Sequence, residues 1–216
     1  MQIITWRIPA TSANLGPGFD CLGLALDLWN ETTFTITGGE TVIENHGEGH
    51  SLLPVNEQNL ILRSFHHLYR YANTPPPRGL RIISKNDIPV SSGMGSSASA
   101  VLAGLLGANS LLGKPFSQEE ILALATELEG HPDNVAPALI GGLVVSAQKG
   151  TQIFTQKLPL ANWDVVVVTP NITWTTQQAR DALPKQVSLA DAVFNIGRTS
   201  LVTQALASGD LLLLRD

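Results

Sequence analysis

The sequence predicts an α+β fold, with strands and helices interspersed and no regular βαβα repeat. Residues 4–8 alternate apolar and polar side chains, which indicates a half-buried strand. A segment rich in alanine and leucine begins at Ser97 and stops near Gly113 and Pro115, as a helix does. Four consecutive valines, residues 165–168, are typical of a strand that is covered on both faces.

The other expected elements follow from turn residues, capping residues and apolar spacing. Pro9 is expected to end the first strand, and small residues over 10–18 predict a loop. Ser117 and Glu120 have the spacing of a capping box, which predicts a helix that begins after Ser117. Residues 44–58 are expected to form a polar excursion. The remaining predictions are strands over 31–37, 80–84 and 143–146 and a helix over 59–71.

The composition is that of a globular protein and argues against several functional classes. The chain has 216 residues, of which 44% are hydrophobic and 14% charged, enough for one large domain or two small ones. A net charge of -5, with lysine and arginine scattered, argues against non-specific binding to nucleic acid. Cys21 is the single cysteine, and the sequence has neither a secretory signal nor a bilayer-spanning run. We therefore expect a cytoplasmic protein that binds no membrane.

The most informative segment is the glycine–serine loop, PVSSGMGSSAS, at residues 89–99. Gly93 and Gly95 lack the Cβ atoms that keep an anion away from the backbone, so successive N–H groups can point at one phosphate. The helix that begins near Ser97 adds the positive end of its dipole. The hydroxyls of Ser96 and Ser97 can reach a phosphate oxygen or Mg²⁺. A flexible loop is the plainer reading, but the order of strand, loop and helix favours phosphate binding. The segment matches neither a Walker A motif nor the dinucleotide-binding fingerprint.

Three segments together resemble the GHMP kinases, and the homoserine kinases in particular. The glycine–serine loop is similar to the phosphate-binding motif of that family. PATSANLGPGFDCLGLAL (residues 9–26) and EGHPDNVAPALIGG (residues 129–142) resemble blocks found in homoserine kinases, in the same order. The resemblance implies a GHMP kinase fold, with a ribosomal-S5-like N-terminal domain over residues 1–155 and the start of a ferredoxin-like C-terminal domain over 156–216. It also implies ATP-dependent phosphorylation of the L-homoserine side-chain hydroxyl in threonine biosynthesis, with Mg²⁺.

The same resemblance implies which residues hold the nucleotide and the metal ion. Ser97 and Glu127 are expected to bind Mg²⁺, and Glu129 is the competing carboxylate because the spacing before Asp-Asn varies. Asn59 is expected to contact the adenine. The other residues expected to bind ATP are Pro89, Val90, Ser91, Ser92, Gly93, Met94, Gly95, Ser96, Ser97, Ala98 and Ser99.

For the acceptor side, the residues alone and the resemblance lead to different readings. Asn14 and Asp20 flank a Gly-Pro-Gly turn, where asparagine and aspartate usually serve as turn and cap residues. The resemblance instead places both beside the acceptor, as substrate-binding and catalytic residues. It leaves open whether Asp20 holds the substrate ammonium or accepts the hydroxyl proton, and we favour binding.

The rest of the acceptor site is expected from two later segments. Asp133 and Asn134 are expected on the substrate, with Asn134 also catalytic, and His131 is expected to be structural. Arg180, in a Thr-x-x-Ala-Arg segment with Thr176, is expected to bind the substrate carboxylate, which suits a planar guanidinium.

Homoserine kinases continue past the point where this sequence ends. The resemblance therefore implies a C-terminally truncated chain with partly exposed leucines at 211–214 and weak or no activity by itself. Two alternatives stay open: a GHMP kinase that acts on mevalonate or a sugar, and a non-catalytic nucleotide-binding module. The expected partners are L-homoserine and ATP. A homodimer is compatible with the sequence, which does not specify the oligomeric state.

Overall fold

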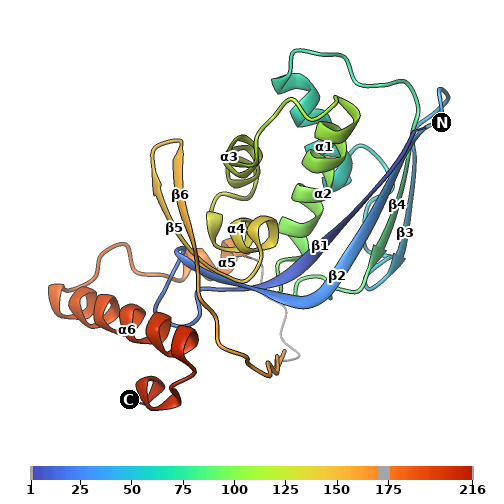
Figure 1. The fold of residues 1–216 in the computed structure, drawn as a ribbon. Helices are drawn as coiled ribbons and strands as arrows, with labels where there is room; N and C mark the ends of the chain where they lie inside the picture. Colours follow the sequence, from blue (N-terminus) through green and yellow to red (C-terminus); the bar gives the residue numbers. More distant parts are fainter. Residues whose placement is uncertain (1, 170–175, 216) are drawn as a thin grey trace.

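The computed structural model describes residues 2–169 and 176–215, and it places a mixed sheet beside a group of helices (Figure 1). The sheet has the order β3-β4-β2-β5-β6, and β1 pairs with β2 off this path. Only the β3–β4 pair is parallel, and α1 forms the crossover between its strands. The strands are β1 (Ile3–Ala13), β2 (Leu22–Ile36), β3 (Val42–Gly47), β4 (Leu80–Asn86), β5 (Leu143–Lys149) and β6 (Gln152–Leu158).

Four helices, α1 to α4, gather on one side of the sheet, and α6 lies apart from them near the C-terminal end (Figure 1). The α2 helix is the centre of this group, because it is apolar on nearly all sides and most of its residues are buried. The helices are α1 (Leu60–Tyr71), α2 (Ser96–Leu111), α3 (Gln118–Glu129), α4 (Pro132–Ile140), α5 (Thr176–Asp181) and α6 (Leu189–Ser208), followed by the 3₁₀ helix η1 (Leu211–Leu214).

The core forms where α1 and α2 pack against β2. The rings of Phe34 and Phe65 stack with their centroids 5.7 Å apart, and both side chains are fully buried. A Cβ added to Gly107 would lie 2.5 Å from the Phe34 ring. Gly107 therefore allows α2 to pack closely against the sheet. This packing fixes the position of the helix start, which follows the glycine–serine loop.

Several expected elements are confirmed by the structure. Asn59 caps α1, accepting bonds from the N–H groups of Ile61 and Leu62. The capping box of Ser117 and Glu120 forms as predicted and begins α3. The strands expected over 80–84 and 143–146 are present as β4 and β5, which extend to residues 86 and 149.

Other expectations were wrong, and packing explains most of them. The first strand continues past Pro9 to Ala13, because a bulge between Pro9 and Ala10 accommodates the missing N–H. The excursion over 44–58 contains part of β3, which β4 supports by parallel pairing. Residues 165–168 form no strand in the described part of the chain, and the Val166 side chain is 86% exposed. β6 and α4 were not predicted.

The last described elements expose apolar side chains. Leu211, Leu212 and Leu214 of η1 are 43% exposed or more, as expected. None of the described helices combines the length and the apolar character that a bilayer crossing requires.

Candidate active site

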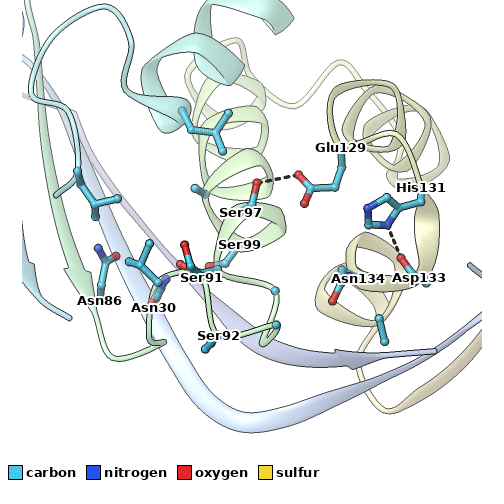
Figure 2. Close-up of a pocket in the computed structure, with 18 of the residues that line it drawn as sticks. Asn30, Asn86, Ser91, Ser92, Ser97, Ser99, Glu129, His131, Asp133 and Asn134 are labelled. Carbon is cyan, nitrogen blue, oxygen red and sulfur yellow. Dashed lines mark hydrogen bonds and ion pairs between the residues drawn. The ribbon is translucent and has the colours of Figure 1, made fainter. Parts of the chain in front are cut away.

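A cavity of about 770 Å³ lies between the glycine–serine loop, the sheet and the start of α4. Figure 2 shows its elongated arrangement. Asn30 and Asn86 stand at one end, the serines of the loop lie in the middle, and Glu129, His131, Asp133 and Asn134 stand at the other end. The cavity therefore joins the two regions that the sequence assigned separately to a phosphate and to an acceptor.

The glycine–serine loop owes its shape to positive φ angles. Gly93 and Gly95 have φ values of 77° and 70°, and Ser91 has 59°. Gly95 is also the N-cap of α2, so the free N–H groups of the helix face the cavity at this point. A Cβ on Gly95 would lie 2.1 Å from Thr11 Oγ1. Only glycine therefore fits between β1 and the start of α2 without a shift of its neighbours.

Most of the residues predicted for the loop line the cavity, but three do not. Pro89 accepts a bond from the Ser92 hydroxyl, and the Met94 carbonyl accepts one from Thr11 N. Ala98 is fully buried in the core. The structure therefore places these three residues against the sheet and the core, away from the residues that line the cavity. The loop residues that line the cavity are Val90, Ser91, Ser92, Gly93, Gly95, Ser96, Ser97 and Ser99.

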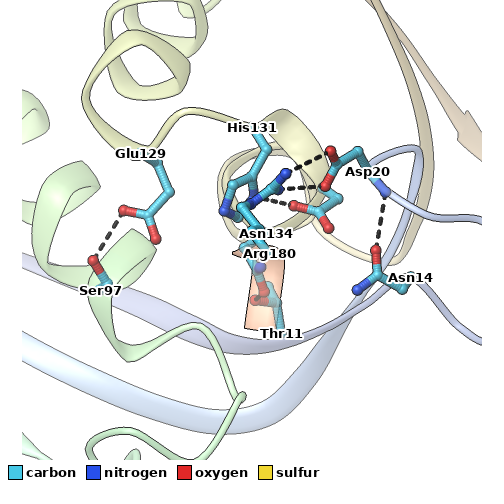
Figure 3. Close-up of polar contacts among 9 residues, drawn as sticks. Thr11, Asn14, Asp20, Ser97, Glu129, His131, Asn134 and Arg180 are labelled. Atoms are coloured by element: carbon cyan, nitrogen blue, oxygen red, sulfur yellow. Dashed lines mark hydrogen bonds and ion pairs between the residues drawn. The ribbon is translucent and has the colours of Figure 1, made fainter. Parts of the chain in front are cut away.

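Of the two carboxylates considered for the metal ion, the structure places Glu129 beside Ser97. Ser97 Oγ donates a hydrogen bond of 2.9 Å to Glu129 Oε2, and both residues line the cavity (Figure 3). Glu127 is exposed and does not line it. Glu129, rather than the expected Glu127, is therefore the carboxylate that accompanies Ser97. Burial raises the pKa of Glu129, and the bond from the Ser97 hydroxyl lowers it in part.

Hydroxyl and carboxylate oxygens are ligands that Mg²⁺ prefers, so the Ser97–Glu129 pair fits this ion. The pair lies one helical turn or less from the N–H groups that begin α2, where a phosphate would sit. A metal held here could therefore contact a bound phosphate chain.

Asn59, the residue expected at the adenine, has its polar atoms engaged within the fold. The residue lines the cavity, but its side-chain oxygen caps α1 and its amide nitrogen donates to Pro54 O at 2.7 Å. Its amide is thus occupied inside the fold. Asn86, which sequence reasoning missed, is better placed to donate a hydrogen bond to a ligand at this end of the cavity. Ser84 Oγ donates to its side-chain oxygen at 2.8 Å, and its amide nitrogen has no partner among the described residues.

At the acceptor end, Asp20 and Arg180 form a bidentate ion pair. Arg180 NH2 and NH1 donate to Asp20 Oδ1 and Oδ2 at 2.6 and 3.1 Å (Figure 3). The bonds to Asp20 raise the pKa of Arg180, whose guanidinium also lies over the Phe19 ring. Asn14 Oδ1 accepts a bond from Asp20 N at 2.9 Å. The structure thus brings together three residues predicted for the substrate.

The start of α4 supplies the rest of this end. Asp133 is buried and bonds to His131 Nδ1, and this bond raises the pKa of His131 against the effect of burial. Asn134 Oδ1 accepts a bond from the buried Thr11 hydroxyl at 2.7 Å, so its amide N–H groups are the part left for a ligand. Ligand atoms of Asp20, His131 and Asp133 lie within 4.8 Å of one another. Sequence reasoning missed the contact of His131 with the cavity, although its position in the HPDN segment was a signal.

Thr176 was predicted for the site, whereas Cys21 was not. Thr176 begins α5, and its side chain lies outside the described part of the structure. Cys21 is partly buried and does not line the cavity, and burial raises the pKa of its thiol. The two ends of the cavity suit different parts of small molecules. Backbone N–H groups at one end can bind an anion, and the opposite charges of Asp20 and Arg180 at the other end can bind a zwitterion.

Comparisons with known proteins show which family the chain resembles in sequence and in fold. The family model described as the N-terminal domain of GHMP kinases matches residues 59–142. The homoserine kinase of Moorella thermoacetica is 44% identical over 206 residues, which cover 95% of this chain and 69% of that protein. That of Clostridium beijerinckii is 43% identical, with 99% and 70% covered.

A solved structure of homoserine kinase from Cytophaga hutchinsonii superposes with a TM-score of 0.80 at 29% identity, covering 99% of this chain and 70% of that one. This chain thus spans about 70% of the length of these relatives. The sequence identity, its extent and the shared fold show that the chain belongs to the homoserine kinase family of the GHMP kinases.

Proposed function

We propose that this protein transfers the γ-phosphoryl group of ATP to the side-chain hydroxyl of L-homoserine, in the cytoplasm, as a step of threonine biosynthesis. The single observation that supports this best is the shape of the cavity. It joins a helix N-terminus lined by N–H groups to a carboxylate and a guanidinium that face each other. An amino acid with a free hydroxyl fits such an arrangement, because its own charges can pair with both groups.

ATP is proposed to lie along the cavity with its phosphates at the glycine–serine loop. The N–H groups that begin α2 meet the phosphate charge. The base then points toward the end that Asn86 and Asn30 line. The Asn30 oxygen already accepts bonds from Asp87 N and Ile88 N, so the free amide nitrogen of Asn86 is the group proposed to donate to the base.

Mg²⁺ is proposed to be held by Ser97 Oγ and a carboxylate oxygen of Glu129. When bound there it would neutralise charge on the phosphates. The Ser97 hydroxyl now donates to Glu129, and it would turn to present its lone pairs to the ion.

L-Homoserine is proposed to replace the ion pair between Asp20 and Arg180. Its carboxylate takes the Arg180 guanidinium, and its ammonium takes the Asp20 carboxylate. Since Asp20 is engaged by a charge partner, this proposal uses it for binding rather than as a base. The N–H groups of Asn134, aligned by Thr11, are proposed to meet the acceptor hydroxyl and the developing charge on the phosphoryl group.

Phosphoryl transfer needs alignment and charge stabilisation more than a strong base. In this proposal the chain supplies both: the loop fixes the donor, and the residues of the acceptor end fix the hydroxyl opposite it. We also propose that the N-terminal domain ends after β6, near residue 158, because a boundary at 155 would divide that strand.

Replacing Glu129 by glutamine is expected to weaken Mg²⁺-dependent nucleotide binding about tenfold or more, because an amide is a poorer ligand than a carboxylate. Binding of a non-hydrolysable ATP analogue would be measured by calorimetry across a series of Mg²⁺ concentrations. Glu127→Gln is the matched control on the same helix, and we expect no change from it. The reverse result would restore Glu127 as the metal ligand.

The proposed function is tested by comparing three acceptors. Binding of L-homoserine, mevalonate and galactose to the nucleotide-loaded protein would be measured together with release of ADP. We expect L-homoserine alone to bind, and any ADP release, which is expected to be weak for this chain, to occur with L-homoserine and not with mevalonate or galactose. A preference for mevalonate or galactose would assign the chain to another GHMP activity, and nucleotide binding without any acceptor would favour a binding module.

A further inference from the structure

The loop that carries Asn14 and Asp20, residues 14–20, has an unusual backbone and is called here the acceptor loop. Asn14, Leu15 and Asp20 have positive φ values of 66°, 46° and 56°. Non-glycine residues adopt this region rarely, and they keep it only where the surroundings hold them. The shape of the acceptor loop therefore depends on contacts that fix it from outside its own sequence.

Bonds within the acceptor loop and to the start of β2 hold its two ends. Asn14 N donates to Leu22 O at 2.8 Å, and Gly18 N donates to Asn14 O at 2.9 Å. The tip, at Gly16 and Pro17, is held differently. Pro17 has no N–H, and no backbone N–H of the described residues bonds to its carbonyl.

The α6 helix supplies the missing donor at the tip. Asn195 Nδ2 donates to Pro17 O at 2.8 Å, across 178 positions of sequence. Thr199 Oγ1 lies 2.9 Å from the same oxygen, but it is also 2.8 Å from Asn195 O. A hydroxyl has one proton, so it serves one of these acceptors at a time, whereas the amide of Asn195 is committed to the loop.

Packing does not replace this hydrogen bond. A second cavity, of about 340 Å³, lies between the tip of the acceptor loop and the residues of α6 and η1. Gly16 and Pro17 line it together with Phe194 and Leu201. The tip is thus open on this side, and polar contacts from Asn195 and Thr199 link α6 to it, of which the Asn195 bond is the committed one.

We propose that Asn195 is a positioning residue for the substrate, which keeps the Asp20 carboxylate and the Asn14 amide in place for L-homoserine through the carbonyl of Pro17. Asn195 does not line the main cavity and acts only through the acceptor loop. This inference rests on the proposed function. It adds that α6 controls affinity for the amino acid and leaves affinity for the nucleotide unchanged.

The test replaces Asn195 by alanine and by aspartate and measures two affinities by calorimetry. Loss of one hydrogen bond is expected to raise the Kd for L-homoserine about tenfold in both variants, since aspartate keeps the size but not the donor. The Kd for the ATP analogue should stay within about twofold of its original value. In the kinase reaction the homoserine KM should rise more than kcat falls.

Two further variants separate positioning from a general effect on α6. Asn195→Gln keeps the N–H donor and is expected to retain part of the homoserine affinity that the aspartate variant loses. Thr203→Ala removes a hydroxyl that, among the described residues, bonds to Thr199 O within the same helix, and it should leave both affinities unchanged.

The inference is overturned if the alanine and aspartate variants bind L-homoserine as the original chain does. It is also overturned if both affinities fall together, since that result means general loss of structure. If the alanine variant does not fold, the comparison of glutamine with aspartate decides, and equal homoserine affinities would contradict the role. An original chain that binds nucleotide but no homoserine would overturn the proposed function, and this inference with it.

Discussion

Replacing Gly95 by alanine is expected to weaken nucleotide binding by about a hundredfold or more. Gly95 has a φ of 70°, which L-residues adopt only at a cost of about 1–2 kcal/mol. The added Cβ would also lie 2.1 Å from Thr11 Oγ1 and 3.2 Å from Asn134 Oδ1. Thr11 is fully buried and cannot move aside. The start of α2 must therefore shift, and the N–H groups that would bind phosphate shift with it.

The matched control is Gly93→Ala in the same loop. Gly93 has a similar φ of 77°, but nothing lies within 4 Å of the added Cβ. This variant carries the backbone cost alone, so we expect a loss of about tenfold. Calorimetry with a non-hydrolysable ATP analogue measures both. If the Gly95 variant binds the analogue as tightly as the Gly93 variant does, the contact with Thr11 does not determine the shape of the phosphate site.

Replacing Arg180 by alanine is expected to raise the KM for L-homoserine about a hundredfold, with a smaller effect on kcat. The guanidinium makes two short bonds to a carboxylate here, and each bond to a charged group contributes about 1.5–3 kcal/mol. A substrate carboxylate would lose the same two bonds. Steady-state kinetics with varied homoserine, at a saturating nucleotide concentration, measure the change.

Two other arginine variants serve as controls. Arg180→Lys keeps the charge but not the two-pronged geometry, and we expect an intermediate rise in KM. Arg198 lies on α6, where it stacks on Phe194 and does not line the main cavity, so Arg198→Ala should leave homoserine kinetics unchanged. If Arg180→Ala leaves the homoserine KM unchanged, Arg180 does not bind the substrate carboxylate.

The nucleotide half of the site was the more predictable half, because its parts are close in sequence. The glycine–serine loop, the start of α2 and the serines that face the cavity lie within residues 90–99. Local backbone rules decide their geometry. The sequence does not decide which residues of this segment line the cavity and which, such as Ala98, are buried in the core. That depends on which side of the first helical turn meets the core, and it is a property of packing.

The choice between Glu127 and Glu129 could not be made from the sequence. Residues two apart on a helix point about 200° apart, so one of the two must face away from Ser97. Which one faces it depends on how α3 packs beside α2. The structure places Glu129 in the last position of α3, just before the left-handed Gly130, where its side chain reaches the start of α2.

The acceptor end was predictable only through resemblance, because its contacts join distant segments. Arg180 reaches Asp20 across 160 positions and Asn195 reaches Pro17 across 178. Residues 165–168 are a case in which a purely local pattern gave a wrong prediction. Their β-branched run predicts a buried strand, but strand formation requires a neighbour, and no described strand pairs with them.

The central claim is that one cavity holds the nucleotide and the amino acid end to end. A crystal structure of the protein with a non-hydrolysable ATP analogue, Mg²⁺ and L-homoserine tests it most directly. We predict that the terminal phosphate lies at the N-terminus of α2 with Mg²⁺ between Ser97 and Glu129. The homoserine hydroxyl should face that phosphate near Asn134, with its carboxylate on Arg180. Homoserine bound outside the cavity, or a nucleotide whose phosphates lie away from the glycine–serine loop, would contradict the account.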